Sequence, residues 1–128
     1  MHKLNLNTIQ IGTAFVASTE SAAIAAYKEA LQNAQSKDSV LTKSFSRRWA
    51  RGLKNGFITE IENSGVHIRE YPVQGSLTSP VRLTAQQQND KDFNSLWSGE
   101  SPSKPAMLPV AEIFKKLVKE TEELFSAT

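Results

Sequence analysis

The fold of this chain is constrained most by one short run with the pattern of a β-strand, close to the start of the sequence. Thr8–Ile11 alternates in polarity, contains β-branched residues and is ended by Gly12. A parallel-type strand without a neighbour leaves its backbone N–H and C=O groups unpaired, and its covering helices have no sheet to cover. The sequence therefore predicts a mostly α-helical chain with one short strand near Ile9–Gly12. It also indicates a piece of a larger α/β fold.

Several other segments have the periodicity or the end signals of helices. Residues 19–35 are rich in alanine, and Thr19 or Ser21 is a suitable N-cap. The last helix is predicted to begin at Pro109, because apolar residues recur after it at helical spacing. We also predict helices over 55–63 and 80–88, a brief extended piece at 40–42 and a loop over 98–105. The apolar face of the last helix consists of Val110, Ile113, Phe114, Leu117, Val118, Leu124 and Phe125.

The end of the predicted strand also carries a chemical signal. A glycine there lets backbone N–H groups approach a phosphate closely, and the hydroxyl of Thr13 adds a donor. In parallel α/β folds, ligands bind at this end of the sheet. Taken alone, the pattern is more typical of an ordinary turn at the end of a strand.

In the order and spacing of its short motifs, the chain resembles the C-terminal part of the FMN-dependent nitronate monooxygenases, formerly called 2-nitropropane dioxygenases. The resemblance runs from about Leu4 to Phe125. The motifs that carry it are Gln10–Phe15, Ala26–Leu31, Leu41–Ser46, Ala50–Leu53, Tyr71–Pro72 with Gln74, Leu77–Thr78, Asp92–Phe93 and Ser95–Trp97.

The resemblance implies that residues 1–128 form a single segment of an FMN-binding (β/α)8 TIM barrel: its last strand and C-terminal helices. Such a barrel typically takes roughly 250 residues, so this chain of 128 residues is expected to be a fragment. By resemblance, Gln10, Ile11, Gly12 and Thr13 contact FMN. The implied reaction is oxidation of alkyl nitronates by O2 to a carbonyl compound and nitrite, without a metal. We expect the isolated chain to be inactive. A fragment of a flavin-dependent enoyl reductase is the alternative enzyme.

Three positions depart from the family pattern. Arg47 stands where the family has glycine, so it would strain the turn if that position requires a positive φ. Gly75 stands where asparagine is expected. Glu100 replaces a glutamine near the flavin side of the barrel mouth, where a negative charge disfavours a phosphate or reduced flavin. Trp97, three residues earlier, is interpreted as a buried anchor.

A basic segment, residues 43–54, has two opposing interpretations. Its cations are interleaved with Phe45 and Trp49, as in surfaces that bind single-stranded nucleic acid. The net charge of the whole chain is only +2, however, and gives no general attraction to nucleic acid. We therefore expect this segment to pack its aliphatic stems and form ion pairs, and we expect no nucleic-acid partner.

The sequence offers no catalytic group of its own. There is no cysteine, and the two histidines, His2 and His67, have no acidic or hydroxyl partner at a suggestive spacing. The glutamates at 60, 62, 112, 120, 122 and 123 are expected on solvated helix faces. Any chemistry must then come from FMN. We expect a cytoplasmic protein with no membrane or metal site. A non-catalytic interaction module, or a remnant that self-associates through exposed apolar helix faces, is the alternative of another class.

Overall fold

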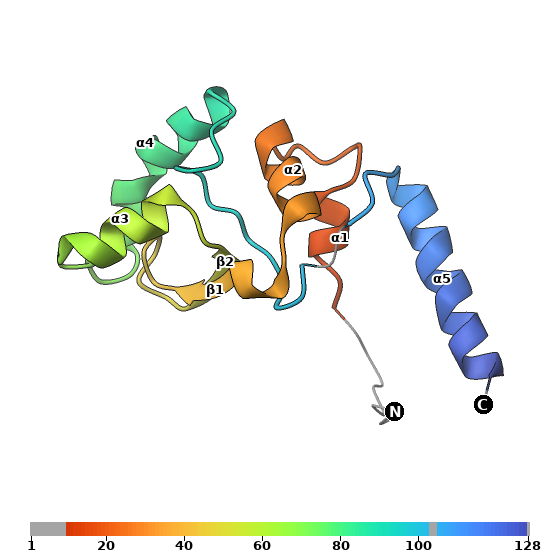
Figure 1. The fold of residues 1–128 in the computed structure, drawn as a ribbon. Coiled ribbons are helices and arrows are strands. Elements are labelled where there is room, and N and C mark those ends of the chain that lie inside the picture. Colours follow the sequence, from red (N-terminus) through yellow and green to blue (C-terminus); the bar gives the residue numbers. More distant parts are fainter. Residues whose placement is uncertain (1–9, 103–104, 128) are drawn as a thin grey trace.

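The structure is a computed structural model, and it describes residues 10–102 and 105–127. Its elements in chain order are α1 (Thr13–Val16), α2 (Ala25–Asn33), a 3-10 turn (Ser36–Asp38), β1 (Ser39–Thr42), β2 (Ala50–Leu53), α3 (Gly56–Ser64), α4 (Val73–Gln87) and α5 (Val110–Ser126). Figure 1 shows α1 and α2 at the centre, the two strands with α3 and α4 on one side, and α5 on the other. The described part is mainly helical, as predicted.

The strand prediction was wrong in number and place. Thr8 and Ile9 lie outside the described residues, and residues 10–12 lead into α1 without strand pairing. The described part instead holds a two-stranded antiparallel sheet, in which β1 pairs with β2 from Ser39 opposite Leu53 to Thr42 opposite Ala50. The extended piece predicted at 40–42 is confirmed as part of β1. The sequence analysis missed β2 because Ala50–Leu53 contains a glycine and an arginine and has no alternation.

Two apolar clusters make up the core. The first joins α2 to the loops and β2 through Ala17, Tyr27, Leu31, Ala34, Leu53 and Leu96. The second, Phe45, Phe57 and Ile58, fixes α3 against the segment after β1, with stacked rings of Phe45 and Phe57 4.7 Å apart. Residues 96 and 97 connect the clusters, since Leu96 belongs to the first and the ring of Trp97 meets Phe45 edge-on at 5.3 Å. Residues 96 and 97 therefore link the two clusters, as do the paired strands, since Leu53 of β2 belongs to the first cluster and Val40 of β1 packs against the second.

Helix α2 begins at Ala25, six residues later than the sequence predicted. The side chains of Thr19 and Ser21 are used locally: Thr19 donates to Glu20, and Ser21 accepts from the N–H of Ala23. The N–H of Ala26 instead donates to Oδ1 of Asn89, which lies 63 residues further along the chain. A cap supplied from so far away leaves no local sequence signal, which is why the start was misplaced.

The helix predicted over 55–63 is confirmed as α3. Asn55 caps it, with its Oδ1 accepting from the N–H of Ile58 at 3.2 Å, and Gly65 ends it in the left-handed conformation with φ 68°. The amide of buried Asn55 also donates to the carbonyls of Lys91 and Asn94. One side chain therefore starts α3 and attaches the segment after α4.

Helix α4 begins at Val73, so Pro80 lies inside it and does not open it as predicted. Buried side chains in the first two turns determine the earlier start: Gln74 donates to the carbonyl of Ser44, and Thr78 donates to that of Phe45. These bonds stabilise turns that the proline alone would not favour. The end of α4 near Asn89, the loop through the described residues 98–102 and 105, and the start of α5 after Pro109 agree with the prediction.

Candidate functional site

Residues 10–13 form the approach to α1. Gly12 is the N-cap of this four-residue helix, and its carbonyl accepts the N–H groups of Phe15 and Val16 at 3.0 and 3.1 Å. As at the start of any helix, the first N–H groups have no intrahelical acceptor. No acceptor among the described residues takes the N–H groups of Gly12, Thr13 or Ala14. Within the described part of the chain, these three donors are not used by the protein itself.

The glycine at position 12 keeps this turn open. A Cβ placed on Gly12 would meet no protein atom within 4 Å, so the space beside its backbone is free. Gln10 is exposed and Ile11 is half-buried, so the approach lies at the surface. The turn thus has the donors and the access that a phosphate needs, although it supplies only one side of an enclosure.

Thr13 is fixed in place by a contact that the sequence analysis did not foresee. Its Oγ1 accepts the N–H of Gly99 at 2.9 Å, across 86 positions of sequence. The carbonyl of Gly99 in turn accepts the hydroxyls of Ser39 at 2.8 Å and Ser98 at 3.3 Å. We call these four residues the Gly99 clasp. Because a hydroxyl can donate while it accepts, Thr13 keeps its own O–H free for a ligand.

The segment 97–100 is positioned by α2 as well as by the clasp. Tyr27 donates its hydroxyl to the carbonyl of Trp97 at 2.5 Å, and burial raises the pKa of Tyr27 to about 12, so it stays a neutral donor near pH 7. Trp97 itself is 37% exposed, so its interpretation as a buried anchor was wrong; Leu96, at 3%, takes that role. Glu100 is exposed and directly follows the clasp. Residues 12–13 and 99–100, far apart in sequence, are therefore neighbours.

The cations of the basic segment are engaged within the protein, as the preferred interpretation predicted. Lys43 lies over the ring of Trp49 and Arg48 over that of Tyr71, at 4.6 and 3.7 Å from the ring centroids. Arg47 pairs with Glu70, and Lys54 with Glu62. Two of the four cations thus lie against aromatic rings and two form ion pairs, although the rings of Trp49 and Tyr71 themselves stay largely exposed.

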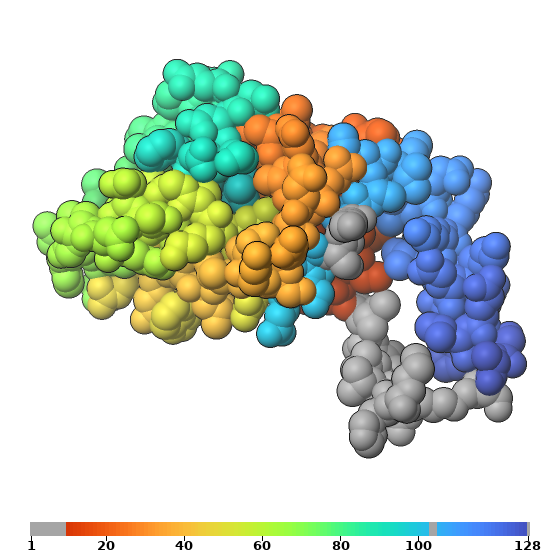
Figure 2. Space-filling model, viewed as in Figure 1, coloured from red at the N-terminus to blue at the C-terminus, as the bar shows by residue number. Residues whose placement is uncertain are grey.

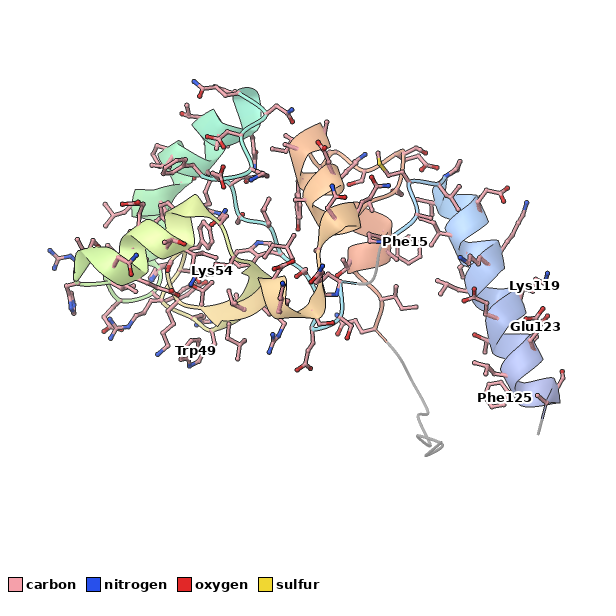
Figure 3. The ribbon with its side chains drawn as sticks, in the orientation of Figure 1. Phe15, Trp49, Lys54, Lys119, Glu123 and Phe125 are labelled. Atoms are coloured by element: carbon pink, nitrogen blue, oxygen red, sulfur yellow. The ribbon has the colours of Figure 1, made fainter. Side chains whose placement is uncertain are left out.

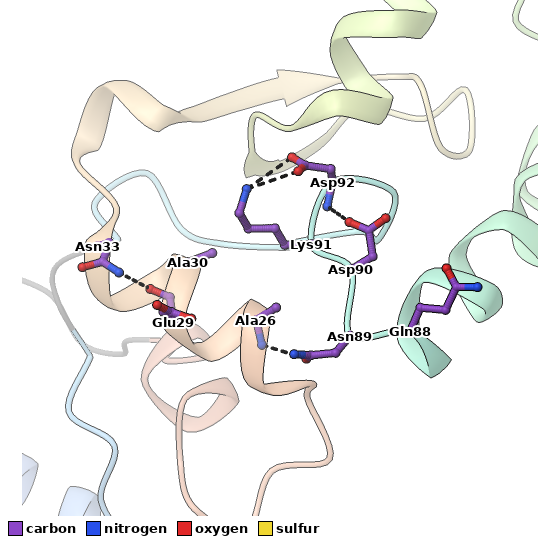
Figure 4. A pocket seen from close by; sticks show the side chains of 9 residues that line it. All are labelled: Ala26, Glu29, Ala30, Asn33, Gln88, Asn89, Asp90, Lys91 and Asp92. Atoms are coloured by element: carbon purple, nitrogen blue, oxygen red, sulfur yellow. Dashed lines mark hydrogen bonds and ion pairs between the residues drawn. The ribbon is translucent and has the colours of Figure 1, made fainter.

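A cleft of about 530 Å³ lies between α2 and the segment after α4, and Figure 4 shows the side chains that line it. The side chain of Asn89 accepts a hydrogen bond from a backbone N–H of α2, and the side-chain amide of Asn33 donates to a backbone carbonyl of the same helix. Lys91 forms an ion pair with Asp92. The cleft is lined by Ala26, Glu29, Ala30, Asn33, Gln88, Asn89, Asp90, Lys91 and Asp92. Three carboxylates against one lysine repel a phosphate, so this cleft is a poor anion site.

The remaining candidates for chemistry are dispersed. His67 is exposed in the loop after α3, which Figure 1 places at the far end of the body from α1, and His2 lies outside the described residues. Within the described ranges, no group of three or more His, Asp or Glu side chains is arranged to hold a metal ion. The six helix glutamates are exposed, as expected. No helix in the described part is long and apolar enough to cross a membrane.

Comparison with known proteins gives consistent matches. The family model described as nitronate monooxygenase matches residues 4–120. A probable nitronate monooxygenase of Staphylococcus aureus (strain JH9) is 35% identical over 121 residues, which are 94% of this chain and 34% of the relative. The structure of a nitroalkane oxidase from Streptomyces ansochromogenes superposes with a TM-score of 0.82 at 34% identity, covering 92% of this chain and 33% of that one. FabK from Thermotoga maritima gives a TM-score of 0.69 at 29% identity, covering 91% and 37%. The chain thus spans about a third of the length of these relatives.

Proposed function

The chain belongs to the nitronate monooxygenase family, a flavin-dependent family, and from this premise we propose that it supplies part of the FMN site of an enzyme that oxidises alkyl nitronates. The proposal places the chain in the C-terminal third of the enzyme. The observation that carries it is the family match over residues 4–120. This range includes the turn at Gly12, where the N–H groups of Gly12, Thr13 and Ala14 have no acceptor among the described residues.

The residues of the turn suit the phosphate end of FMN. In this proposal the N–H groups of Gly12 and Thr13 and the hydroxyl of Thr13 donate to the phosphate, while Gln10 and Ile11 line the approach. In the Gly99 clasp, the backbone N–H of Gly99 donates to the hydroxyl oxygen of Thr13, and this bond fixes the direction of the Thr13 O–H. FMN, when bound, supplies the oxidation of the nitronate by O2, with a carbonyl compound and nitrite as products. Nitronate chemistry is preferred because the nitroalkane oxidase superposes better, at 0.82, than FabK at 0.69.

Flavin fluorescence gives the first test. Titration of FMN with the 128-residue chain alone is expected to give no saturable quenching at low micromolar concentration, because one turn encloses neither the ring nor the rest of the phosphate. Co-expression with the N-terminal two-thirds of the Staphylococcus aureus relative is expected to give a yellow complex that releases nitrite from a nitronate. A stable complex of the two chains that remains colourless would overturn the proposal.

Thr13 variants in that complex test the site itself. Thr13→Val keeps the shape but removes both the donor to the phosphate and the acceptor for Gly99, so FMN binding should weaken by about 1 kcal/mol or more, roughly fivefold in Kd. Thr13→Ser keeps the hydroxyl and is the matched control, with binding expected near that of the unchanged protein. Equal affinities for both variants would show that the hydroxyl is not a ligand.

A further inference from the structure

Residues 96–98 lie along β2 and are fixed to it by backbone hydrogen bonds. The N–H of Leu53 donates to the carbonyl of Leu96 at 2.8 Å, and the N–H of Ser98 donates to the carbonyl of Arg51 at 3.2 Å. The pair of strands thus determines the path of the chain up to residue 98. The next residue is the one that contacts the turn at the start of α1.

Gly99 carries this attachment from the strands to the turn. Its N–H donates to Oγ1 of Thr13 at 2.9 Å, and its carbonyl accepts the hydroxyl of Ser39 at 2.8 Å. A glycine has no side chain to restrict its backbone, so hydrogen bonds must hold its two peptide planes. Because the two planes meet at one Cα, the bond from Ser39 limits the movement of Gly99 and keeps its N–H directed at Thr13.

Ser39 is well placed to hold that carbonyl. It is the first residue of β1 and is only 7% exposed, so water has little access to its hydroxyl. The hydroxyl of Ser98 is a second donor to the carbonyl of Gly99, at the longer distance of 3.3 Å. In Figure 2 the light-blue atoms near residue 100 lie between the orange atoms of the segment that enters β1 and the red atoms of the turn. A buried hydroxyl of a strand therefore acts on a turn at the surface.

Helix α1 is held on its other side by apolar packing. Phe15 projects from α1 toward α5 (Figure 3), and Val16 packs against the first core cluster. Neither contact determines where the hydroxyl of Thr13 points. A hydroxyl oxygen that accepts an N–H must turn its own hydrogen away from that donor. The position of Gly99 thus decides the direction in which Thr13 can donate.

We propose that Ser39 is a positioning residue for the phosphate of FMN: it holds Gly99, and Gly99 directs the O–H of Thr13 at the phosphate. This role rests on the proposed function, since it takes Thr13 as a ligand of FMN. Ser39 acts through Gly99 and does not itself contact the cofactor. Its loss should therefore weaken recognition of the phosphate and leave recognition of the flavin ring unchanged.

Flavin affinities in the complex with the N-terminal two-thirds of the Staphylococcus aureus relative test this role. Ser39→Ala with Ser98→Ala removes both hydroxyls that donate to the carbonyl of Gly99. FMN should then bind about fivefold more weakly, the effect of one lost hydrogen bond. Riboflavin, which lacks the phosphate, should bind as it does to the unchanged complex. In a Thr13→Val background the same pair of changes should cause no further loss of FMN affinity, because the hydroxyl that they position is absent.

Ser44→Ala is the matched control. It makes the same chemical change at another buried serine, whose hydroxyl accepts from Thr42 and lies outside the Gly99 clasp, so FMN affinity should stay the same. A second measurement needs no cofactor. In the 128-residue chain alone, hydrogen exchange followed by NMR should show the amide of Gly99 exchanging severalfold faster in the Ser39→Ala, Ser98→Ala variant than in Ser44→Ala or the unchanged chain.

The role of Ser39 is overturned if FMN affinity does not change, if riboflavin loses as much affinity as FMN, or if the loss persists in the Thr13→Val background. An unchanged exchange rate of the Gly99 amide overturns it as well. In each of these cases the unchanged complex still binds FMN, and the proposed function stands. A complex of the unchanged chain that binds no FMN overturns the proposed function itself, and the role of Ser39 with it.

Discussion

At the scale of single residues, Gly52 shows how closely the chain packs at the join between the two core clusters. Strand β2 and residues 96–98 lie side by side: the N–H of Leu53 donates to the carbonyl of Leu96 at 2.8 Å, and Gly52 forms a bridge with Trp97. A Cβ on Gly52 would lie 2.7 Å from the carbonyl oxygen of Leu96. Only glycine fits, because that oxygen belongs to a backbone that is itself hydrogen-bonded.

We predict that Gly52→Ala lowers the free energy of unfolding by about 1–3 kcal/mol, the usual cost of forcing extra atoms into a packed site. Gly75→Ala is the matched control, because its Cβ meets nothing within 4 Å and the position is helical. Alanine there should stabilise α4 by about 0.5–1 kcal/mol. Urea unfolding followed by circular dichroism measures both, and equal effects of the two changes would contradict the assignment.

Arg47 has a φ of 72°, the positive φ at which an arginine was expected to strain this turn. Its guanidinium has also acquired contacts, to the carbonyl of Ile68 and to Glu70, with the latter at 2.9 Å. The arginine thus combines an unfavourable backbone conformation with two bonds that hold the loop after α3.

Comparison of Arg47→Gly with Arg47→Ala separates these two effects. Both variants lose the side-chain contacts and keep the left-handed backbone conformation. That conformation is costly for alanine, which has a Cβ, but not for glycine. We expect Arg47→Ala to be less stable than Arg47→Gly by about 1 kcal/mol. Thermal unfolding of the two proteins side by side checks this. If alanine is as stable as glycine, position 47 carries no backbone strain.

At the scale of elements, the sequence predicted correctly where the signal is local. Helix α3 has its cap at Asn55 and its stop at Gly65 within the segment, and α5 has Pro109 and a long apolar stripe. The starts of α2 and α4 were misplaced because Asn89, Ser44 and Phe45, all distant in sequence, supply the deciding hydrogen bonds. The turn at Gly12 was identified from its residue types, but the clasp that fixes Thr13 could not be, since it joins positions 86 residues apart.

The start of α5 should respond to pH through Glu20. Hydrogen bonds from Thr19, its own backbone and Val110 hold the pKa of Glu20 below its ordinary value. A lowered pKa in the folded state means that the contact stabilises above the ordinary pKa and is lost as the pH falls through the lowered one. We predict that the amide resonance of Val110 shifts as the pH is lowered from 7 to 3. Glu20→Gln should remove that dependence, and an unchanged titration in the variant would show another group responsible.

At the scale of the whole molecule, the described part has two small apolar clusters and the helix α5 at its edge, and it has no single large core. A chain of this size buries only about two-thirds of its unfolded surface even when compact. The described part still exposes large apolar side chains on β1, α4 and α5, among them Leu41, Leu77 and Phe114. These exposed side chains are the feature from which the self-association expected from the sequence would arise.

We predict a broad thermal transition whose midpoint rises with protein concentration, because dimers stabilise the folded state by mass action. Calorimetric and van't Hoff enthalpies should disagree, since the folded chain is in equilibrium with associated forms and has two small clusters in place of one core. Scanning calorimetry over a hundredfold range of concentration makes the measurement. A sharp, reversible transition at a constant midpoint would contradict a marginal, associating chain.

The position of Leu96 and Trp97 has a consequence for synthesis on the ribosome. Leu96 completes the cluster around α2, and Trp97 packs its ring on Phe45 of the other cluster. Neither cluster can close fully until these two residues have left the exit tunnel, although helices α2 and α3 are made long before. The apolar residues of both clusters therefore stay partly uncovered until residues 96 and 97 emerge, and the final packing must await these contacts between segments distant in sequence.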